Sequence, residues 1–350
     1  MRTSLVILVL FFLNCHPYEK ESGNQREVTE HAKKEVVAFV YHRFGDNKYP
    51  STNISTVLFE QHLSYLKTHE FKVLTFGEAI DYINNPAIPY SKKVACITID
   101  DGYKSFQSNA VPLLQKYNYK ATVFINSESV GGGTYMDWND LKEIHDQGIE
   151  IGNHSHGHAY FLNTAKNERI EFFKNDVQKC QEEIHKHLGF YPDIFAYPYG
   201  EFDLEMKTAL DGMDFKGAAA QNSGVMYHCD NFAFARFPMA GSYASLDGFI
   251  EKANMKALRA NCATSSSFVL EGDNPPTITI EIDSSGADLS RLNCFTSGDC
   301  ETAVNGNLVT IKAKNKLNGR RTLYTITAPS KKGNAWYWYS HLWIRPEIHE

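Results

Sequence analysis

Short apolar runs alternate with amphipathic stretches from residue 36 to about residue 258. The apolar runs predict buried strands, and the stretches with apolar positions three or four residues apart predict helices. The predicted strands cover residues 36–41, 71–74, 94–99, 121–125, 149–151, 194–197 and 215–219. The predicted helices cover residues 58–68, 77–83, 106–117, 138–146, 168–188, 204–210 and 249–258. This alternation indicates an α/β fold, either a (β/α) barrel or an open parallel sheet, which periodicity does not separate.

The pattern changes after residue 262, where a Ser/Thr-rich stretch ends the helical periodicity. Residues 277–282, 308–312 and 322–326 alternate apolar and polar positions, which predicts strands with one solvated face. A chain of 350 residues is long enough for two folded units. We therefore expect an α/β domain over residues 35–260 and a small, all-β, sandwich-like domain over residues 266–350.

The N-terminus has the features of an export signal. Arg2 is followed by the apolar residues 5–13, a run too short to span a membrane. We expect a signal peptide over residues 1–15 and a disordered polar tether over residues 16–34. Cys15 fits a lipidated, membrane-attached N-terminus, but Asn14 stands where a small residue is usual, so simple secretion stays open. In either case the protein acts outside the cytoplasm, secreted or lipid-anchored in a bacterial cell envelope.

Charge and cysteine content narrow the picture further. The formal net charge is −6, and no basic patch with interleaved aromatics is present, so we expect no nucleic-acid partner. Cys96 and Cys180 fall in a predicted strand and helix, where buried free thiols are expected. Cys294 and Cys300 bracket a turn-like segment and are the disulfide we expect in an oxidising compartment. The oligomeric state is not indicated.

Two polar strings follow predicted strands and carry the candidate chemistry. Asp100-Asp101-Gly102 follows residues 94–99, and His154-Ser155-His156-Gly157-His158 follows residues 149–151. Alone, the first string is a common turn and the second fits a solvated histidine pair. Together, at the carboxyl ends of strands in one domain, they predict a metal site.

A catalytic metal site needs about three protein ligands and an open position, which Asp101, His154 and His158 supply. Asp100 then remains free to accept a proton, and His156 is expected to point elsewhere. We expect one divalent ion, with zinc favoured and cobalt, manganese or nickel also compatible with these ligands. These features predict a metal-dependent hydrolase.

The two strings resemble the first and second motifs of the polysaccharide deacetylases, the NodB-homology superfamily or carbohydrate esterase family 4. The resemblance covers residues 36–258 and implies a distorted (β/α)7 barrel, with Asp100 as general base beside the Asp101/His154/His158 metal site. Residues 195–200 resemble the third motif, whose Tyr197, Pro198 and Tyr199 would line the substrate groove. By the same analogy, the backbone N–H of Tyr199 would help to bind the oxyanion.

The sequence departs from the family pattern at two points. Ala196 stands where the third motif usually has an arginine that pairs with the base, and Arg236 is our candidate to restore that charge. The late Leu-x-His motif, whose histidine protonates the leaving amine, has no convincing match before residue 258. His42, directly after the first predicted strand, is the candidate acid, and His228 is a weaker alternative.

The function expected from this resemblance is removal of N-acetyl groups from an extracytoplasmic polysaccharide containing N-acetylglucosamine, either exopolysaccharide or peptidoglycan. Residues 41–46 and 59–63 also resemble exported deacetylases of poly-N-acetylglucosamine. The alternative is a catalytically inactive, carbohydrate-binding cell-surface protein. Aromatic residues at 336–343 fit either a sugar-stacking surface or ordinary strand packing. Amide hydrolysis on a small molecule is disfavoured by the export signal and the extra domain.

Overall fold

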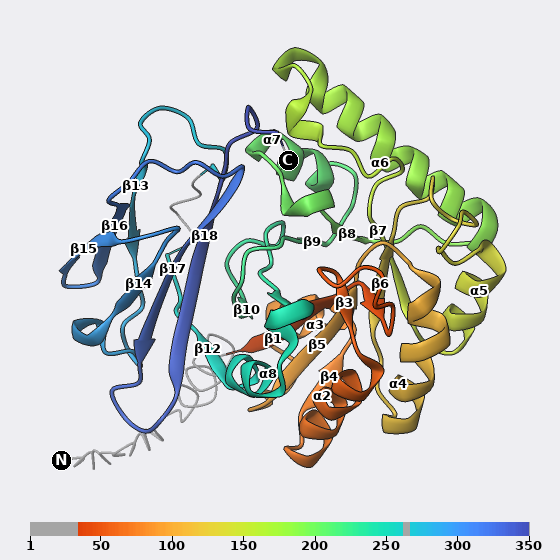
Figure 1. The fold of residues 1–350 in the computed structure, drawn as a ribbon, viewed down its shortest axis with the longest axis horizontal. Coiled ribbons are helices and arrows are strands. Elements are labelled where there is room, and N and C mark those ends of the chain that lie inside the picture. The colour runs from red at the N-terminus through yellow and green to blue at the C-terminus, as the bar shows by residue number, and fades with distance from the viewer. Residues whose placement is uncertain (1–33, 262–266, 350) are drawn as a thin grey trace, which may run out of the picture.

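The computed structural model describes residues 34–261 and 267–349 (Figure 1). The predicted signal peptide, Cys15 and all of the predicted tether except Lys34 lie outside these residues. Within the described part of the chain, no helix is both long and apolar enough to cross a membrane.

The first unit is built on a curled sheet of nine strands with the order β10–β1–β5–β6–β7–β8–β9, to which β11 adds beside β1 and β4 beside β5. Its pairings are parallel except that between β1 and β10. The strands are β1 (Glu35–Tyr41), β4 (Lys72–Leu74), β5 (Val94–Ile99), β6 (Thr122–Ile125), β7 (Glu150–Asn153), β8 (Ile194–Ala196), β9 (Gly217–Ala219), β10 (Met226–Tyr227) and β11 (Phe237–Pro238). The predicted barrel-type fold is confirmed, in the form of a curled half-barrel.

Helices follow most of these strands, and polar side chains set where several begin. Ser55 accepts a hydrogen bond from the Leu58 N–H, and Thr75 and Glu78 form a reciprocal capping box. The described α-helices are α2 (Thr56–Thr68), α3 (Phe76–Asn84), α4 (Val111–Tyr117), α5 (Trp138–Asp146), α6 (Lys166–Leu188), α7 (Leu204–Asp211) and α8 (Leu246–Ala253). Shorter elements are β2 (Arg43–Phe44), β3 (Asn53–Ile54), a π-helical turn at Phe106–Ala110, and 3-10 turns at Phe161–Asn163, Pro198–Gly200, Gly241–Ala244 and Leu289–Arg291.

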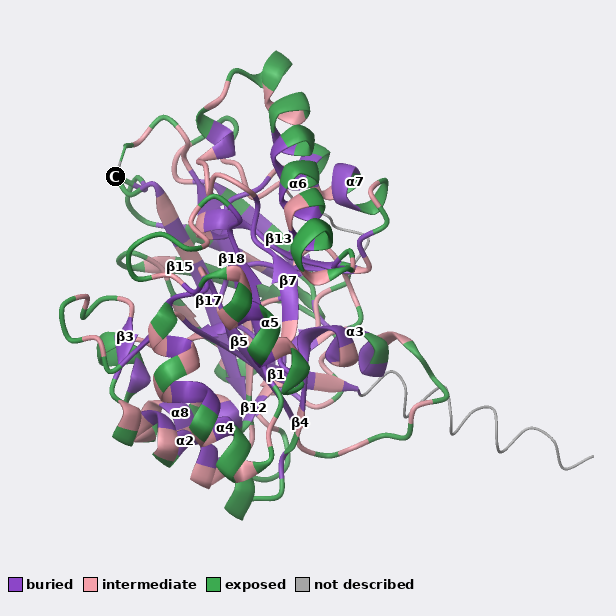
Figure 2. Cartoon of the chain, turned by 90° about the vertical axis from the view of Figure 1, so that its right-hand side faces the viewer, coloured by how far each residue is buried: buried purple, intermediate pink, exposed green. Residues whose placement is uncertain are grey.

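Apolar side chains on the sheet form the core of this unit. All six residues of β5 are buried, and Phe39 and Ile97 lie in one cluster with Leu63 of α2 and Ile184 of α6. Figure 2 shows the central strands β1 and β5 coloured as buried, while α5 and α6 carry exposed residues. The strands therefore form a rigid base for the loops at their carboxyl ends.

The second unit consists of two small sheets over a shared core. One has the order β12–β18–β17–β14 and the other β13–β16–β15. Their inward residues, among them Ile280, Ile311 and Ile326, form one cluster, as expected for stacked sheets. The strands are β12 (Met255–Ala257), β13 (Thr277–Glu281), β14 (Asn293–Phe295), β15 (Cys300–Asn305), β16 (Leu308–Ala313), β17 (Arg321–Pro329) and β18 (Trp336–Ile344). The predicted disulfide between Cys294 and Cys300 is present, and Cys96 and Cys180 are buried free thiols as predicted.

The junction between the units differs from the prediction. The last helix of the first unit ends at Ala253 rather than at residue 258, because residues 255–257 form β12 and pair in parallel with β18. The aromatic residues of β18 are largely used in packing. Trp338 donates from its indole N–H to the Ser223 carbonyl (2.9 Å), and only 9% of Trp343 is exposed.

Candidate active site

Asp100 and Asp101 lie where β5 ends. The Asp100 N–H donates to the carbonyl of Tyr41 at the end of β1 (2.9 Å), which extends the sheet hydrogen bonding by one residue. Asp101 and Gly102 then adopt φ angles of 75° and 77°. A positive φ is strained for a non-glycine residue and is held only where the surrounding structure demands it. The two carboxylates thus stand at the edge of the sheet where functional residues gather in parallel α/β folds.

Asp100 forms a buried two-point ion pair with Arg236. Arg236 Nη1 donates to Oδ1 (2.7 Å) and Nη2 to Oδ2 (2.8 Å), and both side chains are fully buried. Burial alone would raise the pKa of Asp100, but Arg236, together with His154 and His42, holds this pKa below its usual range. Arg236 is fixed by further donation to the Ala220 carbonyl (3.0 Å) and to Thr98 Oγ1 (3.0 Å). The arginine missing at Ala196 is thus supplied by another segment of the chain.

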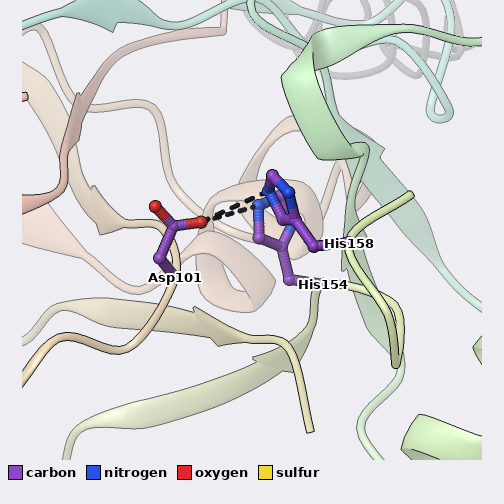
Figure 3. A group of neighbouring side chains, drawn as sticks. All are labelled: Asp101, His154 and His158. Atoms are coloured by element: carbon purple, nitrogen blue, oxygen red, sulfur yellow. Dashed lines mark ion pairs between the residues drawn. The ribbon is translucent and has the colours of Figure 1, made fainter. Parts of the chain in front are cut away.

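Asp101, His154 and His158 converge on one point (Figure 3). Asp101 Oδ1 lies 3.6 Å from Nε2 of His154 and 3.3 Å from Nε2 of His158. The candidate ligand atoms all lie within 4.8 Å of one another. Burial would raise the pKa of Asp101, but the neighbouring imidazoles of His154 and His158 hold this pKa well below its usual range. The group therefore presents a carboxylate and two imidazole nitrogens to a common centre.

The surroundings of His154 fix which of its nitrogens faces that centre. Its Nδ1 lies 2.7 Å from the Ala196 carbonyl, an acceptor, so Nδ1 carries the proton and Nε2 keeps its lone pair. Hydrogen bonding of the outer nitrogen is the usual way in which a metal-ligating histidine is oriented. The donor set, its spacing and this orientation fit a divalent metal with an open position.

The loop of residues 154–158 is stabilised by hydrogen bonds to side chains that are not candidate metal ligands. Asp176 of α6 accepts hydrogen bonds from the N–H groups of His156 (2.6 Å) and Gly157 (3.0 Å). Ser155 Oγ accepts from the His158 N–H (3.0 Å), and Ser155 and His158 both have positive φ. His156 turns to Ser127, whose Oγ lies 2.8 Å from its Nδ1. The loop thus directs His154 and His158 to the metal centre and His156 away from it.

The third-motif segment turns sharply beside His158. Tyr199 and Gly200 have φ angles of 59° and 69°, and a Cβ on Gly200 would lie 2.5 Å from the Cβ of Gln221. The Tyr199 ring meets the His158 ring edge-on (4.5 Å between centroids) and stacks on Tyr160 (3.6 Å). Burial and the neighbouring Tyr160 raise the pKa of Tyr199 to about 12, so its phenol stays neutral.

Tyr197 does not fit its predicted role in substrate binding. Its side chain is fully buried and packs against Phe195 and Phe202 in the core. The side chain has no surface that a substrate could touch, because the strand that precedes the turn directs it inward. Pro198 is also buried, so of the three predicted groove residues only Tyr199 has a partly exposed side chain.

His42 and His228, the two candidate acids, lie in different places. His42 follows β1, close enough to Asp100 and Asp101 to lower the pKa of both carboxyls. Its buried Nδ1 has no hydrogen-bond partner among the described residues. His228 follows β10, which pairs with the amino end of β1 at Glu35, and its Nδ1 lies 2.8 Å from Asn84 Oδ1. His228 thus lies at the opposite end of β1 from the carboxylates, a position that favours His42 of the two candidates.

Comparison with known proteins agrees with this geometry. Residues 87–218 match the family model described as polysaccharide deacetylase. The chain carries a polysaccharide deacetylase domain. A relative named poly-beta-1,6-N-acetyl-D-glucosamine N-deacetylase, from Staphylococcus epidermidis, is 22% identical over 280 residues, which cover 70% of this chain and 96% of the relative. The predicted family is confirmed, and with it the class of hydrolases that act on carbon–nitrogen bonds outside peptides.

Solved structures of deacetylases share the fold of the deacetylase domain. The Streptococcus pyogenes deacetylase PplD, solved with acetate, superposes with a TM-score of 0.57 at 20% identity, covering 63% of this chain and 99% of that one. IcaB from Ammonifex degensii gives a TM-score of 0.53 at 23% identity, covering 63% of this chain and 97% of that one.

Several residues around the site of the deacetylase domain are missed by sequence reasoning. Asp176 lies in the middle of a helix and Tyr160 follows the second motif, and neither stands in a recognisable pattern. On another side of the site, the Arg43 guanidinium lies 3.4 Å from the centroid of the Tyr103 ring, which packs on Tyr135 (4.7 Å). Only the position of Tyr103, directly after Gly102, could have indicated its closeness to the site.

Proposed function

We propose that the protein is a metal-dependent N-deacetylase that hydrolyses N-acetyl groups of an extracytoplasmic polysaccharide containing N-acetylglucosamine. The observation that carries this proposal is the pairing of two functions on adjacent residues. Asp100 is held ionised by Arg236, while Asp101 joins His154 and His158 in a ligand set. The name of the staphylococcal relative supports the choice of an N-acetylglucosamine polymer.

A divalent ion held by Asp101, His154 and His158 would polarise the acetyl carbonyl and make a nearby water more acidic. Zinc is our first choice, and cobalt, manganese or nickel suit the same ligands. Side chains and backbone groups of this chain carry out the proton transfers and help to bind the oxyanion.

Asp100 is the general base in this mechanism. A carboxylate oxygen of Asp100 takes a proton from the water that attacks the acetyl carbon, and Arg236 keeps Asp100 ionised and oriented between turnovers. The backbone N–H of Tyr199 donates a hydrogen bond to the developing oxyanion, for which a preorganised donor is most effective. The turn that sets the orientation of this N–H has a positive φ at Tyr199.

His42 is the proposed general acid. Cleavage of the carbon–nitrogen bond requires a proton on the leaving amine, and His42 lies beside both aspartates at the end of β1. Its unpartnered Nδ1 leaves one ring nitrogen without a structural role in the described residues. Proton transfer from His42 would yield the free amine and acetate.

The N-terminal segment and the two folded units complete the proposed function. Residues 1–15 act as an export signal, and Cys15, if lipidated, attaches the protein to the membrane through the tether of residues 16–34. The catalytic domain extends over residues 35–260 and the accessory β domain over residues 266–350. Replacing Cys15 with alanine should move the protein from the membrane fraction to the soluble extracytoplasmic fraction, and an unchanged distribution would contradict lipidation.

Acetate release tests the activity and the substrate together. The protein is incubated with poly-N-acetylglucosamine and with peptidoglycan, with and without a chelator, and each divalent ion is then added back. We expect acetate from one polymer, loss of activity with chelator, and recovery with zinc. If neither polymer yields acetate but the protein binds one of them, the alternative of an inactive carbohydrate-binding protein is favoured. The buried Asp100–Arg236 pair argues against an inactive protein, because Arg236 supplies the charge that the family's arginine would provide at position 196.

A further inference from the structure

A buried carboxylate follows the Tyr199 turn directly. Glu201 comes after Gly200 and is 3% exposed. Its oxygens accept hydrogen bonds from Nε (2.6 Å) and Nη2 (2.7 Å) of Arg320, and Arg321 Nη1 adds a third contact (3.2 Å). Both arginines belong to the second unit: Arg321 is the first residue of β17, and Arg320 directly precedes it. The turn that carries the oxyanion donor is therefore tied to the C-terminal unit by a charged, two-point contact.

Arg320 also packs against the ring of Tyr160, which stacks on Tyr199. Its Nη2 donates to Asn163 Oδ1 (2.8 Å), and its guanidinium carbon lies 4.6 Å from the centroid of the Tyr160 ring. Tyr160 stacks on Tyr199, which in turn meets His158. One arginine thus supports the Tyr199 turn from two directions, through Glu201 and through Tyr160.

The guanidinium of Arg320 is itself fixed within the second unit. Nη1 donates to the carbonyls of Pro346 (2.9 Å) and Ile348 (2.8 Å), and the residue is 3% exposed. With the two bonds to Glu201 and the bond to Asn163, these contacts occupy all five guanidinium N–H groups. A lysine has three donors on one atom and does not reproduce this planar arrangement.

We propose that Arg320 is a positioning residue of the active site, which orients the Tyr199 turn beside His158 through Glu201 and Tyr160. This inference rests on the proposed function and adds that the C-terminal unit completes the active site. The reaction itself takes place on the first unit, and Arg320 touches neither the candidate ligands nor the base.

The decisive variant is Arg320→Lys, which keeps a positive charge beside Glu201 but loses the two-point geometry. We expect kcat for acetate release to fall about 10- to 100-fold, because a small displacement of a catalytic donor is costly. KM and zinc affinity should stay close to wild type. Arg259→Lys is the matched control, since Arg259 is partly buried and, like Arg320, pairs with a carboxylate, here Glu35, away from Tyr199. This control should leave kcat unchanged.

Hydrogen–deuterium exchange supplies a readout that does not depend on activity. In Arg320→Lys, peptides covering residues 158–165 and 195–205 should exchange faster, while the peptide covering residues 96–106 should not change. If Arg320→Lys does not fold, the double variant Glu201→Gln/Arg320→Gln removes both buried charges and should give the same loss of kcat.

The outcomes separate the two proposals. Wild-type kcat and wild-type exchange in the folded Arg320 variants would overturn the positioning role while acetate release by the wild type upholds the proposed function. If the wild type releases no acetate, the proposed function fails, and exchange alone decides the positioning role. Faster exchange limited to the two peptides then supports it, and unchanged exchange overturns it.

Discussion

The guanidinium of Arg236 donates a hydrogen bond to each oxygen of the Asp100 carboxylate, and neither side chain is exposed to solvent. The two residues are 136 positions apart in the sequence. Because a buried carboxylate without a partner is strongly disfavoured, this pair links the stability of the domain to the ionisation of its proposed base.

Replacing Arg236 with methionine should destabilise the protein. The change leaves Asp100 buried and unpaired, so we expect the free energy of unfolding at neutral pH to fall by about 3–5 kcal/mol. Urea denaturation measures this difference. Arg291→Met, at an exposed position, is the control and should change the free energy of unfolding by less than about 0.5 kcal/mol.

The same comparison has a predictable pH dependence. The pKa of Asp100 is lowered in the folded protein, so the stabilisation by Arg236 is fully present above about pH 4, the usual value of an aspartate. This stabilisation is lost as the pH falls through the lowered pKa of Asp100 in the folded protein. The difference between wild type and Arg236→Met should therefore narrow at acid pH, and a constant difference from pH 7 to pH 3 would argue against this pair.

Mutations of the candidate ligands and of the proposed base should have different effects on metal binding. Asp101→Ala and His154→Ala remove donors from the three-residue set and should abolish both metal binding and acetate release. Asp100→Asn should keep the metal and lose turnover by at least about 100-fold, because the amide accepts no proton. Metal content by mass spectrometry and acetate release measure the two effects. Full activity in Asp100→Asn would end the proposed mechanism.

His42→Ala tests the proposed acid through the pH–rate profile. If His42 protonates the leaving amine, its removal should lower kcat by about 100-fold and abolish the fall in rate at basic pH. His228→Ala, remote from the carboxylates, is the matched control and should leave the profile unchanged. A His42→Ala profile with an unaltered basic limb would assign the acid to another group.

His62 should make the fold sensitive to mild acid. Burial lowers the pKa of His62 to about 4, although its hydrogen bond to the Ala244 carbonyl opposes this. Between about pH 6.5 and pH 4 the unfolded chain binds more protons, so stability falls as pH falls, by at most about 1.4 kcal/mol per pH unit. His62→Gln should flatten this slope, whereas His69→Gln, at an exposed position, should preserve it. An unchanged slope in His62→Gln would refute the assignment.

Local patterns predicted the elements that form locally. The apolar run of β5 and the amphipathic stretch of α5 have the predicted bounds, Val94–Ile99 and Trp138–Asp146. In contrast, β12 is only three residues long and forms because β18, about 80 residues later, supplies its partner. Since a three-residue strand has no distinctive periodicity, the local pattern predicts that α8 continues through these residues.

The site was predictable where motifs mark it and not where distant residues meet. Asp100, Asp101, His154 and His158 stand in two short strings, and strand ends bring them together. Arg236 is a candidate only because this chain has Ala196 where the family pattern has an arginine. The contact of Glu201 with Arg320 spans 119 positions, and no local sequence feature marks either residue. The predicted groove position of Tyr197 differs from its buried position because a motif does not indicate which side chains at a strand end face inward.

The parallel pairing of β12 with β18 limits how the two units can be exchanged between proteins. Residues 255–257 continue directly from α8 of the first unit, yet they form the edge of a sheet whose other strands belong to the second. A chimera joined at residue 260 would leave that edge strand behind and expose the backbone N–H and C=O groups of β18. Transplanting the C-terminal unit onto another deacetylase would therefore require a junction before Met255.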